Sequence, residues 1–157
     1  MKFYFFDSSA VVKNYVQEIG SNWVKNVFNA ISTDIIYAAI ITQVEVVAAF
    51  ARQRKGRTLS INDANTSIQQ FNLDFAKDFR SVSINADLID KAVELADKHS
   101  LRGYDAMQLA SALEVYSSLD ALRVDFNLTP FTFVSADSEL NAALSEKLDV
   151  ENPNNYP

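Results

Sequence analysis

The sequence contains no cysteine and only one histidine, His99. Without cysteine there can be no disulfide, no thiolate metal site and no cysteine nucleophile, and a reducing cytoplasm is the simplest location. One histidine excludes zinc sites built from several histidines, and His99 stands at a predicted helix end, where it can complement the helix dipole. We therefore expect any chemistry to depend on carboxylates, hydroxyls or a hard metal ion.

Long apolar runs are also absent from the chain. No apolar stretch reaches the ~18 residues that a membrane span needs, and Asp7 comes too early for the apolar part of a signal peptide. We expect no membrane partner. What the chain does have is 157 residues with a hydrophobic share of 48%, which together predict one domain with a well-filled core.

The charge balance is acidic. Fourteen Lys and Arg against twenty Asp and Glu give a formal charge of −6, which does not suit a protein that holds nucleic acid by bulk positive charge. A bound divalent cation or a local basic patch can still reverse the field at one site. Net charge therefore leaves the substrate open.

Short apolar segments alternate with helical ones along the chain. The expected strands are 2–6, 35–41, 82–84, 131–134 and 148–150. The expected helices are 10–16, 21–31, 42–55, 61–79, one capped by Asn85, 104–116 and 136–146, with an irregular stretch at 120–129. This alternation predicts a three-layer α/β/α domain over residues 1–150, with a central, mostly parallel sheet of four to five strands and a frayed tail at 151–157.

Four acidic residues stand at informative positions. Asp7 and Asp137 follow strands, Asp105 begins a helix, and Glu45 lies in the first turn of an apolar helix. Each also has a purely structural explanation: Asp7 as a turn or cap residue, Asp105 and Asp137 as first-turn acids, and Glu45 in a capping box with Thr42. A carboxylate in so apolar a helix is costly unless it is paired or bound to metal, which favours a functional role for Glu45.

As a set, these acids point to a cation site. In a parallel α/β domain all four positions face the carboxyl edge of the sheet. Four negative charges that converge there repel one another and raise one another's pKa. A hard divalent cation relieves that repulsion, and oxygen ligands without His or Cys favour Mg²⁺ or Mn²⁺. Phosphate is the anion that such a site would attract.

Four segments of the chain resemble the signature blocks of PIN domains, and specifically of VapC-type toxins of toxin–antitoxin pairs. The segments are FYFFDSSAVVKNYV, TQVEVVAAFARQRKGR, LRGYDAMQLASAL and FVSADSELNAAL. They occur in the family's order, and the resemblance extends from Lys2 to about Pro153. The third block is the most specific. The chief departure is the stretch 120–129, which is longer than the family pattern before the fourth strand.

The resemblance implies a PIN fold and a divalent-metal-dependent endoribonuclease, the toxin of a type II toxin–antitoxin pair. By this likeness Asp7, Glu45, Asp105 and Asp137 hold Mg²⁺ or Mn²⁺, Ser8 assists beside Asp7, and Ser135 occupies the family's Thr or Ser position. The implied partners are an RNA substrate, a cognate antitoxin and a second copy of the chain, with the helices near Ser21 and Asn62 as candidate dimer contacts. No acidic position is lost, which favours an active enzyme.

Six further residues are candidates for substrate contact. They are Lys13, Arg52, Arg54, Lys55, Arg102 and Tyr104. The cluster from Arg52 to Arg57 is also what a solvated helix C-terminus needs to complement its dipole, and most of the aromatic residues fall at core positions. Tyr104, which directly precedes Asp105, is the aromatic residue best placed to stack on a base of single-stranded RNA.

Other functions remain as alternatives. A haloacid-dehalogenase-type phosphatase also places an Asp after its first strand, but Asp7 is followed by Ser8 and Ser9 and lacks the second acid of Asp-x-Asp. A receiver domain would need an adjacent acid and a late lysine. A PIN-like module that binds RNA or protein without cutting is the main non-enzymatic alternative.

Overall fold

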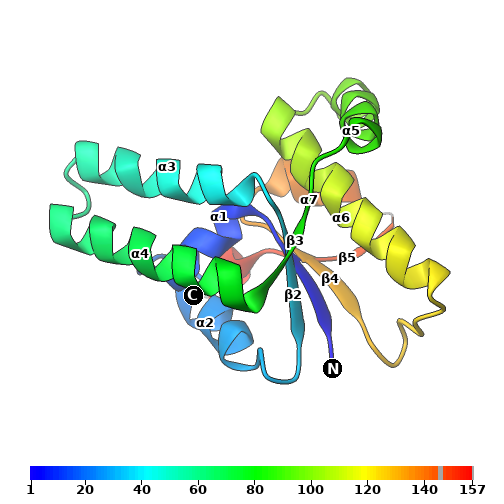
Figure 1. Ribbon diagram of the computed structural model, residues 1–157, viewed down its shortest axis with the longest axis horizontal. Helices are drawn as coiled ribbons and strands as arrows, with labels where there is room; N and C mark the ends of the chain where they lie inside the picture. The colour runs from blue at the N-terminus through cyan, green and yellow to red at the C-terminus, as the bar shows by residue number, and fades with distance from the viewer. Residues whose placement is uncertain (145–146, 157) are drawn as a thin grey trace.

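The computed structural model describes residues 1–144 and 147–156. A parallel sheet of five strands forms its centre, in the order β3-β2-β1-β4-β5 (Figure 1). The strands are β1 (Phe3–Phe6), β2 (Ile35–Ala39), β3 (Phe79–Val82), β4 (Phe131–Val134) and β5 (Asp149–Glu151). The predicted α/β class and parallel sheet are confirmed. The strand order reverses at β1, which makes its carboxyl end a topological switch point.

The first strand alternates its side chains between two cores, because successive residues of a strand point to opposite faces. Tyr4 and Phe6 pack on one face and Phe3 and Phe5 on the other. All four are buried, so a strand covered on both sides appears in the sequence as a continuous apolar run.

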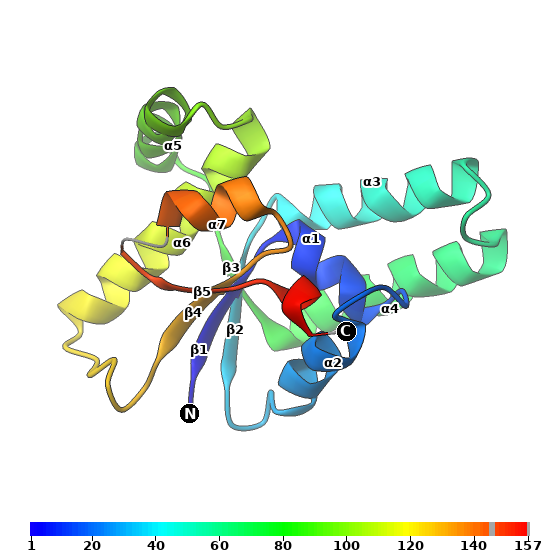
Figure 2. The ribbon, with the colours of Figure 1, turned by 180° about the vertical axis from the view of Figure 1, so that it is seen from behind.

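Seven α-helices cover the sheet within the described part of the chain. They are α1 (Ser8–Val11, followed by a 3-10 turn at Val12–Asn14), α2 (Ser21–Asn29), α3 (Thr42–Lys55), α4 (Ile61–Asp78), α5 (Ala86–His99), α6 (Gly103–Ala121) and α7 (Ser138–Leu144). Helices α1 to α4 pack on the face of Tyr4 and Phe6, and α6 and α7 pack on the other face, with α5 against α6 (Figures 1 and 2). No helix in the described ranges is long and apolar enough to cross a bilayer.

Several predicted elements have different bounds in the structure, among them the first helix, predicted at 10–16, which is α1 followed by the 3-10 turn. The third strand is Phe79–Val82 rather than 82–84, because Phe79 ends α4 and already pairs with Ile36 of β2. Helix α6 continues to Ala121 and takes up the start of the predicted irregular stretch. The last predicted helix, 136–146, begins as α7 at Ser138, and its end falls on 145–146, outside the described residues.

The C-terminal segment is ordered, and the prediction of a frayed tail is wrong for residues 151–156. Glu151 completes β5 and pairs with Val134. Pro153 is buried at the start of a 3-10 turn, Pro153–Asn155. The ring of Tyr156 stacks on Trp23 of α2, with 5.2 Å between the ring centroids and 10° between the planes. The segment therefore covers part of α2.

Candidate active site

Asp7 stands where β1 passes into α1 at the switch point of the sheet. It caps α1, since Oδ1 accepts a hydrogen bond from the backbone N–H of Ala10 at 3.1 Å. The side chain is only 4% exposed. Burial raises the pKa of Asp7 from 3.8 to about 7, opposed by its hydrogen bonds and assisted by the negative charge of Glu45. Asp7 is therefore both the N-cap of α1 and a carboxyl group that burial keeps protonated up to an unusually high pH.

Two serine hydroxyls hold the Asp7 carboxylate, one on each oxygen. Ser9 Oγ donates to Oδ1 at 2.7 Å and Ser135 Oγ, at the end of β4, donates to Oδ2 at 2.9 Å. Ser9 Oγ also accepts from the N–H of Ala136 at 2.9 Å, which links the ends of β1 and β4. Sequence reasoning placed Ser8 beside Asp7, but the hydroxyl there is that of Ser9, and Ser8 hydrogen-bonds Glu45 instead.

Glu45 reaches the site from the first turn of α3. The capping-box explanation fails, because the cap position is Ile41, no side chain caps the helix, and Thr42 is its first residue. Glu45 Oε2 instead accepts a hydrogen bond from Gln108 Nε2 of α6 at 2.5 Å. Burial raises the pKa of Glu45, and the Asp105 carboxylate adds to the rise, while Gln108, Ser8 and Arg52 lower it.

Asp105 and Asp137 come from the N-terminal ends of α6 and α7. Burial raises the pKa of Asp105, with Asp137 as the next cause. The Asp105 carboxylate accepts no hydrogen bond from any described residue, so its oxygens are open to a ligand. Asp137 Oδ1 accepts the N–H groups of Glu139 at 2.8 Å and Leu140 at 3.1 Å. Asp137 thus caps α7, where the sequence had suggested an acid in the first turn, and its Oδ2 remains for other contacts.

Electrostatic coupling connects all four acids. The charge of Glu45 acts on Asp7, that of Asp105 on Glu45, and that of Asp137 on Asp105. The four carboxylates predicted to meet at one edge of the sheet are therefore neighbours in a series. They do not form a tight cage: within residues 1–144 and 147–156, no three acidic or histidine side chains are grouped closely enough to enclose a metal ion.

The donor set nevertheless fits a hard cation. Mg²⁺ binds in proteins through one or two carboxylates and keeps several of its waters, so it does not need a closed cage. All the atoms with which these acids could bind a metal are oxygens. The Asp7 carboxylate accepts three hydrogen bonds, and its lone pairs allow roughly four. One position on Asp7 and both oxygens of Asp105 thus remain for a cation. Mutual repulsion among the acids gives that cation a favourable site.

A hollow of about 400 Å³ opens beside Glu45, between α1, α3 and the start of α6. Arg52 and Tyr104 line it, together with apolar side chains that include Val44 and Ala48. Tyr104 is 58% exposed, so its ring is available for stacking. Two of the six predicted substrate contacts therefore line the same hollow as Glu45.

The other four candidates have different surroundings. Lys13 is buried, and its Nζ donates to Ile19 O at 2.9 Å and pairs with Glu18, so it holds a loop. Arg54 Nη1 donates to Asn65 of α4 at 2.6 Å and ties two helices together. Lys55 is exposed at the far end of α3. Arg102, exposed before α6, is close enough to lower the pKa of Asp105, against burial, which raises it.

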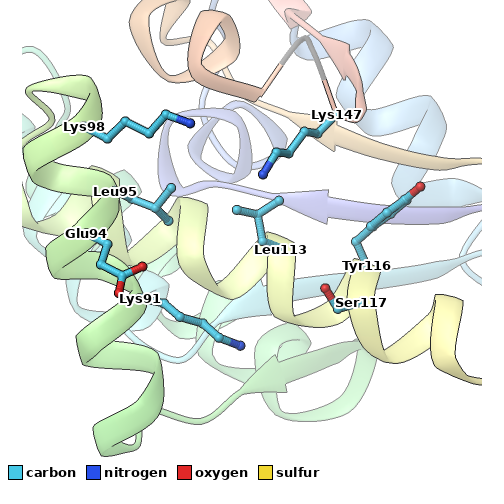
Figure 3. A pocket seen from close by; sticks show the side chains of 8 residues that line it. All are labelled: Lys91, Glu94, Leu95, Lys98, Leu113, Tyr116, Ser117 and Lys147. Carbon is cyan, nitrogen blue, oxygen red and sulfur yellow. The ribbon is translucent and has the colours of Figure 1, made fainter.

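A second hollow lies away from the acids. It measures about 530 Å³ and lies between α5 and α6, with Leu95 and Leu113 in its wall. Lys98 and Lys147 extend into it from opposite sides (Figure 3). None of the four acids lines it, so its size does not make it the active site.

Sequence reasoning missed Ser9 and Gln108. Gln108 carried a signal, because it is an amide among small apolar residues in LRGYDAMQLASAL, the same argument that singled out Glu45. Ser9 carried none that separates it from Ser8. Only the path of the backbone after β1 decides which of two adjacent hydroxyls faces Asp7.

Comparison with known proteins now gives the family. The PIN domain family model matches residues 4–128. This chain belongs to the PIN-domain family. It is 32% identical over 115 residues to ribonuclease VapC45 of Mycobacterium tuberculosis (strain CDC 1551 / Oshkosh), a match that covers 73% of this chain and 78% of the relative. Ribonuclease VapC49 of the H37Rv strain matches to the same extent. The resemblance of the chain to PIN domains and to VapC ribonucleases is confirmed, while the fourth sequence block, at 133–144, lies beyond the matched range 4–128.

Solved structures of other proteins share the fold over most of the chain. VapBC2 of Rickettsia felis, solved with a promoter DNA fragment, has a TM-score of 0.62 at 11% identity and covers 96% of this chain and 98% of its own. VapC20 of Mycobacterium tuberculosis, a toxin that cleaves the sarcin–ricin loop, has a TM-score of 0.58 at 14% identity over 89% and 94% of the two chains. At such identities the likeness concerns the fold alone.

Proposed function

We propose that this PIN domain is a Mg²⁺- or Mn²⁺-dependent endoribonuclease and the toxin of a type II toxin–antitoxin pair. The observation that carries the proposal is the electrostatic series from Asp7 through Glu45 and Asp105 to Asp137, at the switch point of the sheet. The VapC ribonucleases at 32% identity support the reaction class.

The four acids would hold the ion. When bound, a divalent cation polarises a phosphodiester oxygen and lowers the pKa of a water molecule at the site. The Ser9 and Ser135 hydroxyls fix both oxygens of Asp7, and Gln108 fixes Glu45. Asp105, whose carboxylate is unoccupied by described donors, is the group best able to orient or deprotonate the attacking water.

Single-stranded RNA is the substrate class that we propose. Arg52 and Tyr104 line the hollow beside Glu45, where a guanidinium can contact phosphate and an exposed phenol ring can stack on a base. Lys13 and Arg54 are no longer substrate candidates, because their charged groups bind Glu18 and Asn65.

An antitoxin and a second copy of the chain are the proposed protein partners. Solved neighbours of the same fold are toxin–antitoxin complexes, which supports the first. For the second, α4 exposes Ile61 and Leu73, and α5 exposes Ile89 and Val93. Helix α2 is a poorer dimer contact than we expected, since the C-terminal segment packs against it.

The test measures cleavage of a labelled single-stranded RNA of mixed sequence by the purified protein. Wild type should cut with Mg²⁺ or Mn²⁺ and stop with EDTA. Asp7→Asn and Asp105→Asn should lose at least ~100-fold in rate while keeping the wild-type fold. Asp34→Asn is the matched control, because Asp34 binds the Lys2 N–H before β2, at the opposite edge of the sheet.

The outcomes separate the enzyme from its alternatives. RNA binding without cutting in wild type would support the non-catalytic module instead. If Asp34→Asn and Asp7→Asn lost the same cleavage rate, the loss would not depend on removing a carboxylate from the acidic site. Expression of wild type should arrest host growth and expression of Asp7→Asn should not, and normal growth with both would contradict the toxin assignment.

A further inference from the structure

Gln108 is a fully buried amide that connects two helices at the acidic site. It lies on α6, one turn after Asp105, and is 1% exposed. Its Nε2 uses both hydrogens: one goes to Thr42 Oγ1 at 2.9 Å and the other to Glu45 Oε2 at 2.5 Å. Both acceptors are on α3, so this one amide group fixes the start of α3 against the start of α6.

The other end of the amide has no partner among the described residues. Gln108 Oε1 is buried and accepts no hydrogen bond from the described residues, a condition that is unfavourable for folding. Flipping the amide would not help, because Oε1 would then face the Glu45 carboxylate and the Thr42 hydroxyl would lose its donor. The observed orientation therefore directs two N–H donors at α3 and leaves one carbonyl oxygen unsatisfied, an exception of the kind that functional sites retain.

We infer that Gln108 is a positioning residue for the divalent cation of this site and acts through Glu45. This inference rests on the proposed function. Groups that hydrogen-bond a metal-binding carboxylate fix its orientation, and the loss of such a group typically weakens metal binding. Without the amide, the Glu45 side chain loses the hydrogen bond that Gln108 Nε2 donates to Oε2, and with it a contact that fixes its direction.

The test measures Mg²⁺ and Mn²⁺ binding by isothermal titration calorimetry, in the absence of RNA. Gln108→Met keeps the length of the side chain and removes its donors. We expect its dissociation constant for the ion to rise about 10- to 100-fold, the range seen when groups behind metal ligands are removed. Thr42→Val removes the second anchor of the amide and should have a smaller effect in the same direction.

Two comparisons distinguish positioning from general damage. Ser111→Ala removes another buried hydrogen bond of α6, from Ser111 Oγ to Met107 O at 2.8 Å, and should leave the dissociation constant unchanged. In a Glu45→Gln background, Gln108→Met should add little, because its effect passes through Glu45. With RNA, the Mg²⁺ concentration for half-maximal rate should rise in Gln108→Met while KM for RNA stays near that of wild type.

The outcomes also separate this inference from the proposed function. If wild type binds no divalent cation and cuts no RNA, the proposed function fails. If wild type binds and cuts, but Gln108→Met does so with unchanged constants, or if its effect is the same with and without Glu45, the role assigned to Gln108 is wrong and the nuclease remains.

Discussion

At the scale of single residues, burial and hydrogen bonding have opposite effects on the ionisation of Asp7. It caps α1, accepts two serine hydroxyls and is almost fully buried. Its pKa of about 7, raised from 3.8 mainly by burial, means that the folded state keeps a proton that the unfolded state has already released. Between pH 4 and pH 7 the folded protein therefore binds more protons than the unfolded chain, and its stability falls as pH rises.

Asp7→Asn should accordingly stabilise the metal-free protein at about pH 8 and much less at about pH 4, where the carboxyl is protonated in the folded state and roughly half protonated in the unfolded chain. One pKa unit corresponds to about 1.4 kcal/mol, so we expect a gain of roughly 2–4 kcal/mol at the higher pH, reduced by any weakened serine contact. Urea unfolding in EDTA measures it. If the free energies of unfolding of variant and wild type differed by the same amount at both pH values, the raised pKa of Asp7 would not be the cause.

The sequence identified single residues correctly where a polar side chain lies among apolar neighbours. Glu45 was singled out because a carboxylate in an apolar helix is costly, and the structure gives it an amide partner rather than a cap. The same reasoning applied to Gln108 would have found that partner. The choice of Ser9 over Ser8 depends on backbone direction after β1, which no local pattern encodes.

At the scale of elements, four of the five strands were predicted to within two residues, and β3 at one edge was not. β1 is a continuous apolar run with both faces buried, and β4 differs from such a run only by the half-buried Thr132. β3, at one edge, contains exposed Arg80 and Ser81, so its sequence resembles a loop and its start was placed three residues late. β5 and the segment after it are polar, and they are ordered by pairing with β4 and contact with α2.

Gly20 joins the start of α2 to the C-terminal segment. Its φ is +84°, and a Cβ there would lie 2.2 Å from the carbonyl oxygen of Pro153. Gly20→Ala should therefore destabilise the protein by about 2–4 kcal/mol, from the unfavourable φ and the backbone clash together. In thermal unfolding that corresponds to a melting temperature lower by roughly 5–15 °C.

Gly103→Ala is the matched control for this substitution. Gly103 begins α6, and an added Cβ would meet nothing within 4 Å. Alanine should be neutral there or stabilise by less than about 1 kcal/mol, by restricting the unfolded chain. Equal effects of the two substitutions would show that the C-terminal segment does not pack against Gly20 in solution.

At the scale of the whole molecule, an acidic protein is proposed to cut a polyanion. The formal charge is −6, and one bound Mg²⁺ would change it to −6 + 2 = −4, so the molecule stays acidic and only the site becomes attractive to phosphate. Arg52 and Arg102 are the cations that act on the acids directly, both by lowering a carboxyl pKa that burial raises. We therefore predict that ion binding strengthens RNA binding at this edge.

Binding of the ion should also raise the free energy of unfolding of the whole protein. An ion that binds only the folded chain at 100 times its dissociation constant adds about 2.7 kcal/mol, or roughly 5–11 °C in melting temperature for a chain of this size. At about pH 8, above its pKa of about 7, Asp7 is mostly ionised and ready to bind the ion. At about pH 5 the ion must displace the proton of Asp7, so its affinity should fall about tenfold for each unit below 7.

Thermal unfolding with and without Mg²⁺, at constant ionic strength, measures this effect. We expect a large rise in melting temperature at the higher pH, a small one at the lower pH, and a reduced rise at both for Asp7→Asn, while Asp34→Asn should behave as wild type. A rise of the same size at both pH values, or one that Asp7→Asn keeps in full, would place the ion elsewhere on the molecule. The converging acids would then be a cost to folding that no cation relieves.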